Sequence, residues 1–166
     1  TIGAAAGVPD RAEALVATLE ARFNRVRAAV AGRRPQRVLL IVGRRPGTLT
    51  DLVAVGRSSY MSDLATIAGG VNVLSDRGLP EYPRISMETV IRLAPDVIID
   101  AGDMGDTPEG RRSRQMLTEG LWKWERIEAA RAGRVHAVTS DAFVIPGPRV
   151  VEATETMALW LHGVGR

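Results

Sequence analysis

The chain has 166 residues, of which 45% are hydrophobic and 25% are charged, and these are ordinary proportions for a globular domain. They exclude a disordered or collagen-like chain, and no apolar run approaches the roughly 20 residues that cross a bilayer. The chain has no cysteine, which excludes a disulfide scaffold, a thiolate nucleophile and a Cys-ligated metal site.

Basic residues are concentrated near the N-terminus. Residues 1–45 carry nine arginines against three acidic residues, a net charge of +6, whereas residues 46–166 have a net charge of −3. A nucleic-acid-binding protein usually gathers its basic excess on one face. Here most of the excess lies in one helical segment interrupted by apolar positions. We therefore expect a solvated, Arg-rich helix face and no nucleic-acid partner, with binding to a membrane or nucleic acid as the less favoured alternative.

The N-terminal segment predicts a long helix over Pro9–Val30. Proline suits the first helical position, and Gly32 supplies a C-terminal stop. The apolar residues recur every three or four positions and form a single narrow stripe: Leu15, Leu19, Phe23, Val26 and Val30. Such a stripe indicates a helix that lies across another part of the protein and is not buried on all sides.

Three continuous apolar runs predict strands buried on both faces, at residues 37–43, 96–100 and 135–138. Helical patterns alternate with them. We expect helices over residues 58–68, from Ser86 to about residue 94, and over residues 112–119, 121–132 and 148–162, with a long polar loop over residues 44–57. This alternation predicts an α/β fold, a three-layer sandwich with a mainly parallel central sheet.

Ligands of such sheets bind outside the carboxyl ends of the strands. No phosphate-binding glycine pattern and no GxSxG elbow occurs there, which weakens nucleotide binding and serine hydrolysis. Asp100, Asp103 and Asp106 follow the second strand, and Asp141 follows the third. These residues leave open an α/β enzyme or a phospho-receiver-like domain, although aspartates also commonly form turns. A phospho-receiver needs a lysine near its acidic pocket. The only lysine, Lys123, stands between Trp122 and Trp124, which are expected to pack a helix against the sheet, so its position disfavours a receiver.

Two candidate residues stand out in the loop and helix that precede the second strand. Tyr82 lies between Pro80 and Pro83, where an aromatic ring is held at low entropic cost for ligand contact or for packing. Glu88 follows the expected helix cap, Ser86, so the helix dipole favours its charge by about 0.3–1 kcal/mol. The same carboxylate could pair with an arginine of a partner.

Five segments occur together in an order that is similar to a known family: residues 37–43, 58–73 (SSYMSDLATIAGGVNV), 85–100 (ISMETVIRLAPDVIID), 133–141 (GRVHAVTSD) and 147–149 (GPR). They resemble the C-terminal lobe of the helical-backbone periplasmic solute-binding proteins that serve ABC importers of cobalamin, ferric siderophores and haem. The resemblance implies that residues 1–34 are the end of an inter-lobe backbone helix. Residues 35–166 are then the C-terminal α/β lobe, and the N-terminal lobe is absent from this chain. A first residue other than Met, with no signal-peptide pattern after it, agrees with a mature product or an excised piece.

The resemblance implies capture of an iron chelate (ferric siderophore or haem) or cobalamin between two lobes and its delivery to the permease. No enzymatic step, cofactor or resident metal is implied, and the protein is expected in the periplasm or lipid-anchored at the cell surface. The implied permease-docking residue is Glu88. The implied ligand-facing residues are Tyr82, Leu49, Arg57, Asp141, Phe143 and Ile145.

Four arginines lie in or near the implied ligand-facing segments. The resemblance implies that Arg149, in the GPR turn, caps or pairs within the lobe. Arg44, Arg45 and Arg57 are expected on or beside the mouth of the site, where their charge would favour an anionic ligand.

Overall fold

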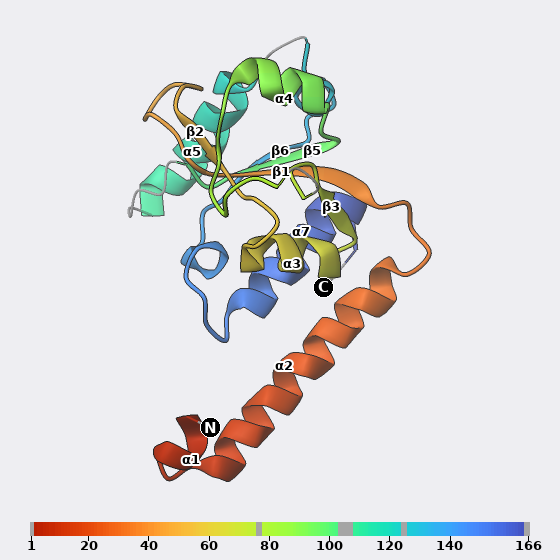
Figure 1. The fold of residues 1–166 in the computed structure, drawn as a ribbon, viewed down its shortest axis with the longest axis vertical. Coiled ribbons are helices and arrows are strands. Elements are labelled where there is room, and N and C mark those ends of the chain that lie inside the picture. The colour runs from red at the N-terminus through yellow and green to blue at the C-terminus, as the bar shows by residue number, and fades with distance from the viewer. Residues whose placement is uncertain (1, 76–77, 103–107, 124–125, 165–166) are drawn as a thin grey trace.

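A six-stranded sheet organises the chain in the computed structural model, which describes residues 2–75, 78–102, 108–123 and 126–164 (Figure 1). The strands are β1 (Gln36–Gly43), β2 (Leu52–Ala54), β3 (Gly70–Asn72), β4 (Arg84–Ile85), β5 (Val97–Asp100) and β6 (Val135–Ala137). Their order is β4-β2-β1-β5-β6, and β3 pairs with the first half of β1. The strands β3, β5 and β6 run parallel to β1, whereas β2 is antiparallel to both β1 and β4. The mainly parallel sheet expected from the sequence is confirmed.

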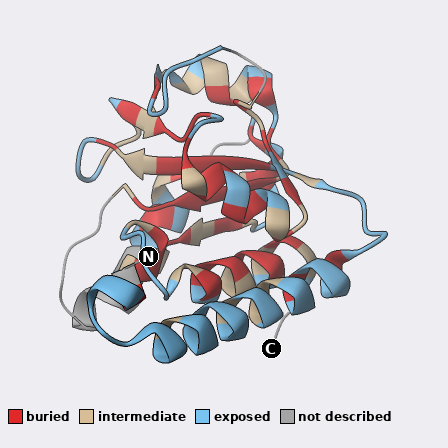
Figure 2. Ribbon diagram, turned by 60° about the horizontal axis from the view of Figure 1, so that its bottom comes forward, coloured by how far each residue is buried: buried red, intermediate tan, exposed pale blue. Residues whose placement is uncertain are grey.

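Helices cover both faces of this sheet. The helices are α1 (Ile2–Ala5), α2 (Pro9–Val30), α3 (Tyr60–Ile67), α4 (Met87–Leu93), α5 (Pro108–Leu121), α6 (Glu128–Arg131) and α7 (Val150–His162), with a 3-10 turn η1 (Asp141–Phe143). Of these, α1 packs against α2 and lies away from the sheet (Figure 1). Successive side chains of a strand point to opposite faces. Val38 and Leu40 of β1 therefore join one buried cluster, with residues of α2, α3 and α7. Their neighbour Leu39 joins the other, with Val90 of α4 and Ala129 of α6. Two cores separated by a buried sheet (Figure 2) confirm the three-layer sandwich.

The long helix α2 has the bounds that the sequence predicts, and about half of it projects from the rest of the molecule (Figure 1). At 1.5 Å per residue its 22 residues extend for about 33 Å. Val26 and Val30 are buried against the lobe, whereas Leu15 and Val16 are 46% and 52% exposed. Arg22 ties the helix to α7 through a two-point ion pair with Glu155, at 2.6 and 2.9 Å. In the described part of the chain, no helix is both long enough and apolar enough to cross a bilayer.

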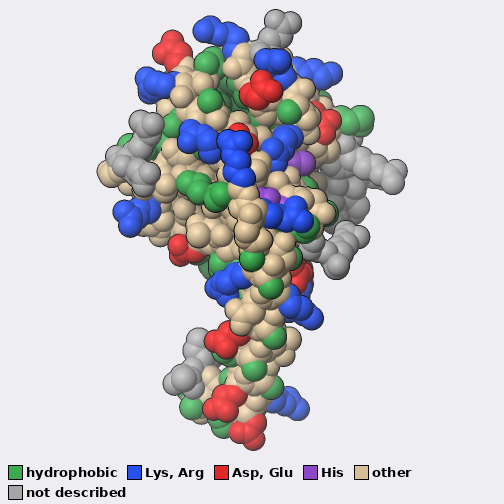
Figure 3. Space-filling model, turned by 90° about the vertical axis from the view of Figure 1, so that its right-hand side faces the viewer, with side chains coloured by type: hydrophobic (Ala, Val, Ile, Leu, Met, Phe, Trp, Pro, Cys, Tyr) green, Lys and Arg blue, Asp and Glu red, His purple; other side chains and the backbone are tan. Residues whose placement is uncertain are grey.

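Basic side chains gather where α2 joins the rest of the molecule (Figure 3). Several of them donate to carbonyl groups at helix C-termini, which lack partners within the helix. Arg33 donates to His162 of α7 at 3.1 Å, Arg37 to Leu93 of α4 at 2.6 Å and Arg134 to Leu161 of α7 at 3.0 Å. These arginines stabilise the fold, which accounts for part of the basic excess without a polyanionic partner.

The prediction of one continuous helix over residues 121–132 is wrong. The preceding helix α5 runs to Leu121, Trp122 then turns into the core with no exposed surface, and α6 is a single turn. Burying the indole outweighs the local preference for a continuous helix. Trp124 lies outside the described residues. The expected polar loop over residues 44–57 contains the short strand β2, the last helix begins at Val150, not at residue 148, and α1, β4 and η1 were not predicted.

Candidate functional site

Hydrogen bonds from the start of α3 reach two of the segments that the sequence marks as ligand-facing. The Ser59 hydroxyl lies 3.3 Å from the Tyr82 hydroxyl, and the neighbouring Tyr60 hydroxyl donates to the Phe143 carbonyl at 3.0 Å. Burial, and secondarily the charge of Tyr82, raises the pKa of Tyr60, which keeps this hydroxyl protonated and able to donate. We call Ser59, Tyr60, Tyr82 and Phe143 the tyrosine face. The sequence marked Tyr82 and Phe143, but it gave no signal for Ser59 and Tyr60.

Tyr82 is held on this face by the backbone around it. The amide of Gly56 donates to the Glu81 carbonyl at 2.7 Å. A Cβ at Gly56 would lie 2.4 Å from the Pro80 carbonyl oxygen, so only glycine permits this close approach. The side chain of Tyr82 is 44% exposed, and Arg57, directly after Gly56, is also exposed. An aromatic ring and a guanidinium are thus both accessible from solvent.

The loop after β6 is closed by an ion pair. Arg149 Nη2 donates to Asp141 Oδ2 at 2.6 Å, as the expected pairing of Arg149 within the lobe requires. This hydrogen bond, with the charge of Arg149, lowers the pKa of Asp141. Ile145 lies inside the closed loop, where its amide donates to the Asp141 carbonyl at 2.8 Å and its side chain is 55% exposed. Asp141 therefore shapes the loop that presents Ile145.

Phe143 turns its ring inward. Only 3% of the residue is exposed, and its ring stacks on Trp160 with centroids 5.3 Å apart. The expected ring platform for a ligand is thus buried, and Phe143 reaches the tyrosine face through its carbonyl. Leu49 lies on the other side of the sheet, packed against the cluster that contains Leu39. The structure brings Tyr82, Asp141, Phe143 and Ile145 close to one another along the chain of hydrogen bonds, but it does not bring Leu49 to them.

Glu88 occupies the first turn of α4, as expected, and is exposed. Ser86 caps this helix: its hydroxyl accepts from the Thr89 amide at 3.3 Å. Within the described residues no ion pair involves Glu88. Leu49 lies beside it, since both line a groove of about 590 Å³.

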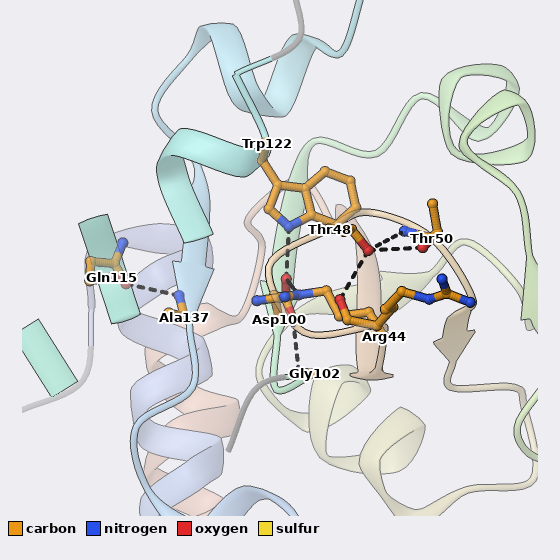
Figure 4. Close-up of polar contacts among 9 residues, drawn as sticks. Arg44, Thr48, Thr50, Asp100, Gly102, Gln115, Trp122 and Ala137 are labelled. Atoms are coloured by element: carbon orange, nitrogen blue, oxygen red, sulfur yellow. Dashed lines mark hydrogen bonds and ion pairs between the residues drawn. The ribbon is translucent and has the colours of Figure 1, made fainter. Parts of the chain in front are cut away.

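Asp100 and Arg44 form a buried ion pair (Figure 4). The Asp100 carboxylate accepts hydrogen bonds from Arg44 Nε at 3.0 Å, from Trp122 Nε1 at 2.8 Å and from the Gly102 amide at 2.7 Å. The expectation that Arg44 lies at the mouth is wrong, because its side chain is 1% exposed and its charge is balanced by Asp100. Arg45 also has a partner, Asp51, at 3.1 Å.

This arrangement does not favour an enzyme or a phospho-receiver. Structural donors occupy the Asp100 carboxylate, and Asp141 is engaged with Arg149. Asp103 and Asp106 lie outside the described residues. Among those described, no group of three His, Asp or Glu side chains could hold a metal ion.

Comparison with known proteins agrees with the architecture. A family model described as a periplasmic binding protein matches residues 1–142. The vitamin B12-binding protein of Salmonella typhimurium is 33% identical over 98 residues, which cover 59% of this chain and 35% of the relative. An uncharacterised ABC transporter substrate-binding lipoprotein of Bacillus subtilis is 22% identical over 160 residues, covering 95% of this chain and 46% of the relative. The chain thus spans about a third to a half of the length of these curated relatives.

Solved structures show the same fold. A periplasmic binding protein of Veillonella parvula superimposes with a TM-score of 0.81 at 24% identity, over 96% of this chain and 53% of that one. A periplasmic heme-binding protein of a Roseiflexus species superimposes with a TM-score of 0.74 at 27% identity, over 98% of this chain and 59% of that one.

Proposed function

Because this chain belongs to the periplasmic binding protein family, we propose that it forms one wall of a two-lobe protein that captures a metal chelate or corrinoid for an ABC permease. The protein lies in the periplasm, as the family description says, or is lipid-anchored at the cell surface, in keeping with the lipoprotein relative. In this proposal residues 35–166 are the C-terminal lobe, and residues 1–34 are the end of the helix that joins the lobes.

The projecting half of α2 supports the two-lobe arrangement. Leu15 and Val16 are about half exposed there, beyond the last contact of the helix with the lobe. A shallow groove of about 320 Å³ runs along the same stretch, between Pro9 and Glu20. Exposed apolar side chains on an isolated rod indicate a surface that another part of a protein covers. The chain also spans only part of the length of its relatives.

The tyrosine face is the observation that carries the ligand proposal. It presents the half-exposed ring of Tyr82, and the segments that it joins also carry the exposed guanidinium of Arg57 and the exposed apolar side chain of Ile145. Hydrogen bonds to Ser59 and Phe143 hold two of the loops in place before binding, which lowers the entropy that a ligand must remove. Such a wall binds a large, flat or rigid ligand without changing it.

The ligand class is proposed from this chemistry and from the relatives. Cobalamin, a ferric siderophore and haem all offer extended surfaces for Tyr82 and Ile145. Arg57 favours an anionic member of this group, such as an acidic ferric chelate or haem with its propionates. Delivery would occur when Glu88, exposed and without an ion-pair partner in the described chain, pairs with an arginine of the permease.

The test uses the full-length two-lobe protein. Fluorescence titration with cyanocobalamin, a ferric hydroxamate, a ferric catecholate and hemin is expected to show saturable, tight binding of at least one of them. Tyr82→Ala should weaken that binding by roughly tenfold or more, since a buried aromatic contact is lost. Glu88→Gln should leave ligand affinity unchanged and reduce uptake in cells.

Glu152→Gln on the exposed side of α7 is the matched control and should change neither quantity. Failure of all four ligands to bind would contradict the proposed ligand class. Loss of ligand affinity in Glu88→Gln would contradict its role in docking.

A further inference from the structure

A groove of about 590 Å³ lies between the 49–51 loop and the start of α4. Leu49, Ile85 and Met87 line it, and all three are half-buried at the edge of the second core cluster. The charged residues of the lining are Asp51, Arg84 and Glu88. We call this feature the β4 groove, because β4 lies at one edge of the sheet and its residues Arg84 and Ile85 form part of the groove wall.

The loop wall of the β4 groove is held in one shape. Asp51 adopts a φ of +56°, a left-handed conformation that costs energy for a residue with a Cβ. In the same loop Asp51 pairs with Arg45, at 3.1 Å, and the Arg45 amide donates to the Thr50 carbonyl at 3.0 Å. A groove with a pre-formed wall binds a partner with little ordering cost.

The charges on the β4 groove select the kind of partner. The carboxylate of Asp51 is already paired with Arg45. Arg84 and Glu88 are both exposed, and among the described residues neither forms an ion pair, with each other or with any other side chain. A simple anion or cation would be attracted by one of them and repelled by the other. A protein segment can present an acidic and a basic side chain at once, with an apolar one over Leu49, Ile85 and Met87.

We propose that the β4 groove, and not Glu88 alone, is the permease-docking surface of this lobe. The occupant is a permease segment that places an arginine or lysine against Glu88 and an aspartate or glutamate against Arg84. This inference rests on the proposed function, because it needs a permease partner. The inference adds a contact at Arg84 of opposite charge to the contact at Glu88. Two contacts of opposite sign fix the orientation of the lobe on the permease as well as attracting it, and so distinguish the cognate permease from others.

The experiment measures binding of the full-length, ligand-loaded protein to its permease–ATPase complex in lipid nanodiscs. Arg84→Glu is expected to weaken binding by roughly tenfold or more, and Arg84→Gln by a smaller factor, since a charge reversal adds repulsion to the lost attraction. Arg92→Glu is the matched control: it makes the same charge change at an exposed position of α4, outside the groove, and should change binding less than twofold. Ligand affinity is expected to be unchanged in all three, and Arg92→Glu is expected to lose a little thermal stability because Arg92 lies in the last turn of α4.

Comparing the Glu88 and Arg84 variants separates failure of this inference from failure of the proposed function. If Glu88→Gln weakens docking while Arg84→Glu and Arg84→Gln behave as Arg92→Glu does, the groove is refuted and docking through Glu88 stands. If none of these variants changes docking, both ideas are wrong. Restoration of Arg84→Glu binding by reversing an acidic residue of the permease to lysine would identify the partner residue directly.

Discussion

Replacing Asp100 with alanine tests whether this aspartate is a structural residue of the lobe. Its side chain is fully buried, as is that of Arg44, and its carboxylate accepts three hydrogen bonds. Removing one member of a buried ion pair costs about 3–5 kcal/mol, because the remaining charge is left in a poorly solvated site. The indole N–H of Trp122 and the amide of Gly102 lose their acceptor as well, at about 1–3 kcal/mol each.

These costs overlap, because all the groups share one small site that water can partly refill. We therefore expect Asp100→Ala to lower the free energy of unfolding by about 4–6 kcal/mol. That is a large share of the roughly 5–15 kcal/mol that stabilises a typical domain. At about 2–4 °C per kcal/mol, the midpoint of thermal unfolding should fall by about 10–20 °C.

Urea unfolding followed by circular dichroism measures the loss, provided that the slope of the transition is unchanged. Trp122→Phe removes one of the donors and should lose less than Asp100→Ala. Glu128→Ala removes the ion pair between Glu128 and Arg131, whose two side chains are both more than 60% exposed. This change should lower the free energy of unfolding by less than about 1 kcal/mol. An Asp100→Ala protein as stable as Glu128→Ala would refute the structural role and return Asp100 to the candidates for chemistry.

Two further predictions concern pH. Burial lowers the pKa of His136 from 6.5 to about 4, with a smaller contribution from Arg134, so the unfolded chain binds a proton that the folded one rejects. The contribution of His136 to the free energy of unfolding is then fully present above about pH 6.5. It falls toward pH 4 by about 1–2 kcal/mol after discounting for solvent screening. His136→Phe should lack this loss in urea titrations, and an equal pH dependence of the wild type and the variant would refute the role of His136. The Arg149 hydrogen bond lowers the pKa of Asp141, so their pair stabilises the fold above the unfolded pKa of 3.8 and is lost as the pH falls through the folded value. The difference in thermal stability between wild type and Asp141→Asn should therefore be constant well above pH 3.8 and shrink as the pH falls below it, and a difference that stays constant on acidification would contradict the pairing.

The candidate site shows where local patterns stop being informative. Glu88 was identified correctly as exposed in the first turn of a capped helix, because a helix cap acts on its immediate neighbours, whereas the sequence left open whether Tyr82 is exposed or packed. Phe143 was expected to be accessible but is buried against Trp160, which lies 17 residues further along the chain. No pattern of neighbouring residues reports such a contact.

The environments of the two arginines after β1 also depend on residues that are distant in the chain. Arg44 and Arg45 are adjacent in sequence, and both were expected beside the mouth of the site. Their environments differ completely: Arg44 is buried against Asp100, 56 residues away, whereas Arg45 pairs with Asp51 in solvent. The sequence carries the charges, but the packing of β1 beside β5 decides which of them are neutralised.

By itself, the sequence determined the fold class, the long helix α2 and the three principal strands β1, β5 and β6, because periodicity and continuous apolar runs are properties of adjacent residues. The tertiary structure alone decided the short strands β2 and β4, the end of α5 at Leu121 and the placement of Leu49 opposite Phe143. A strand of two or three residues has no periodicity to detect, and its stability comes from hydrogen bonds to strands that are distant in the chain. The face of the sheet on which a loop residue packs depends on the same distant contacts.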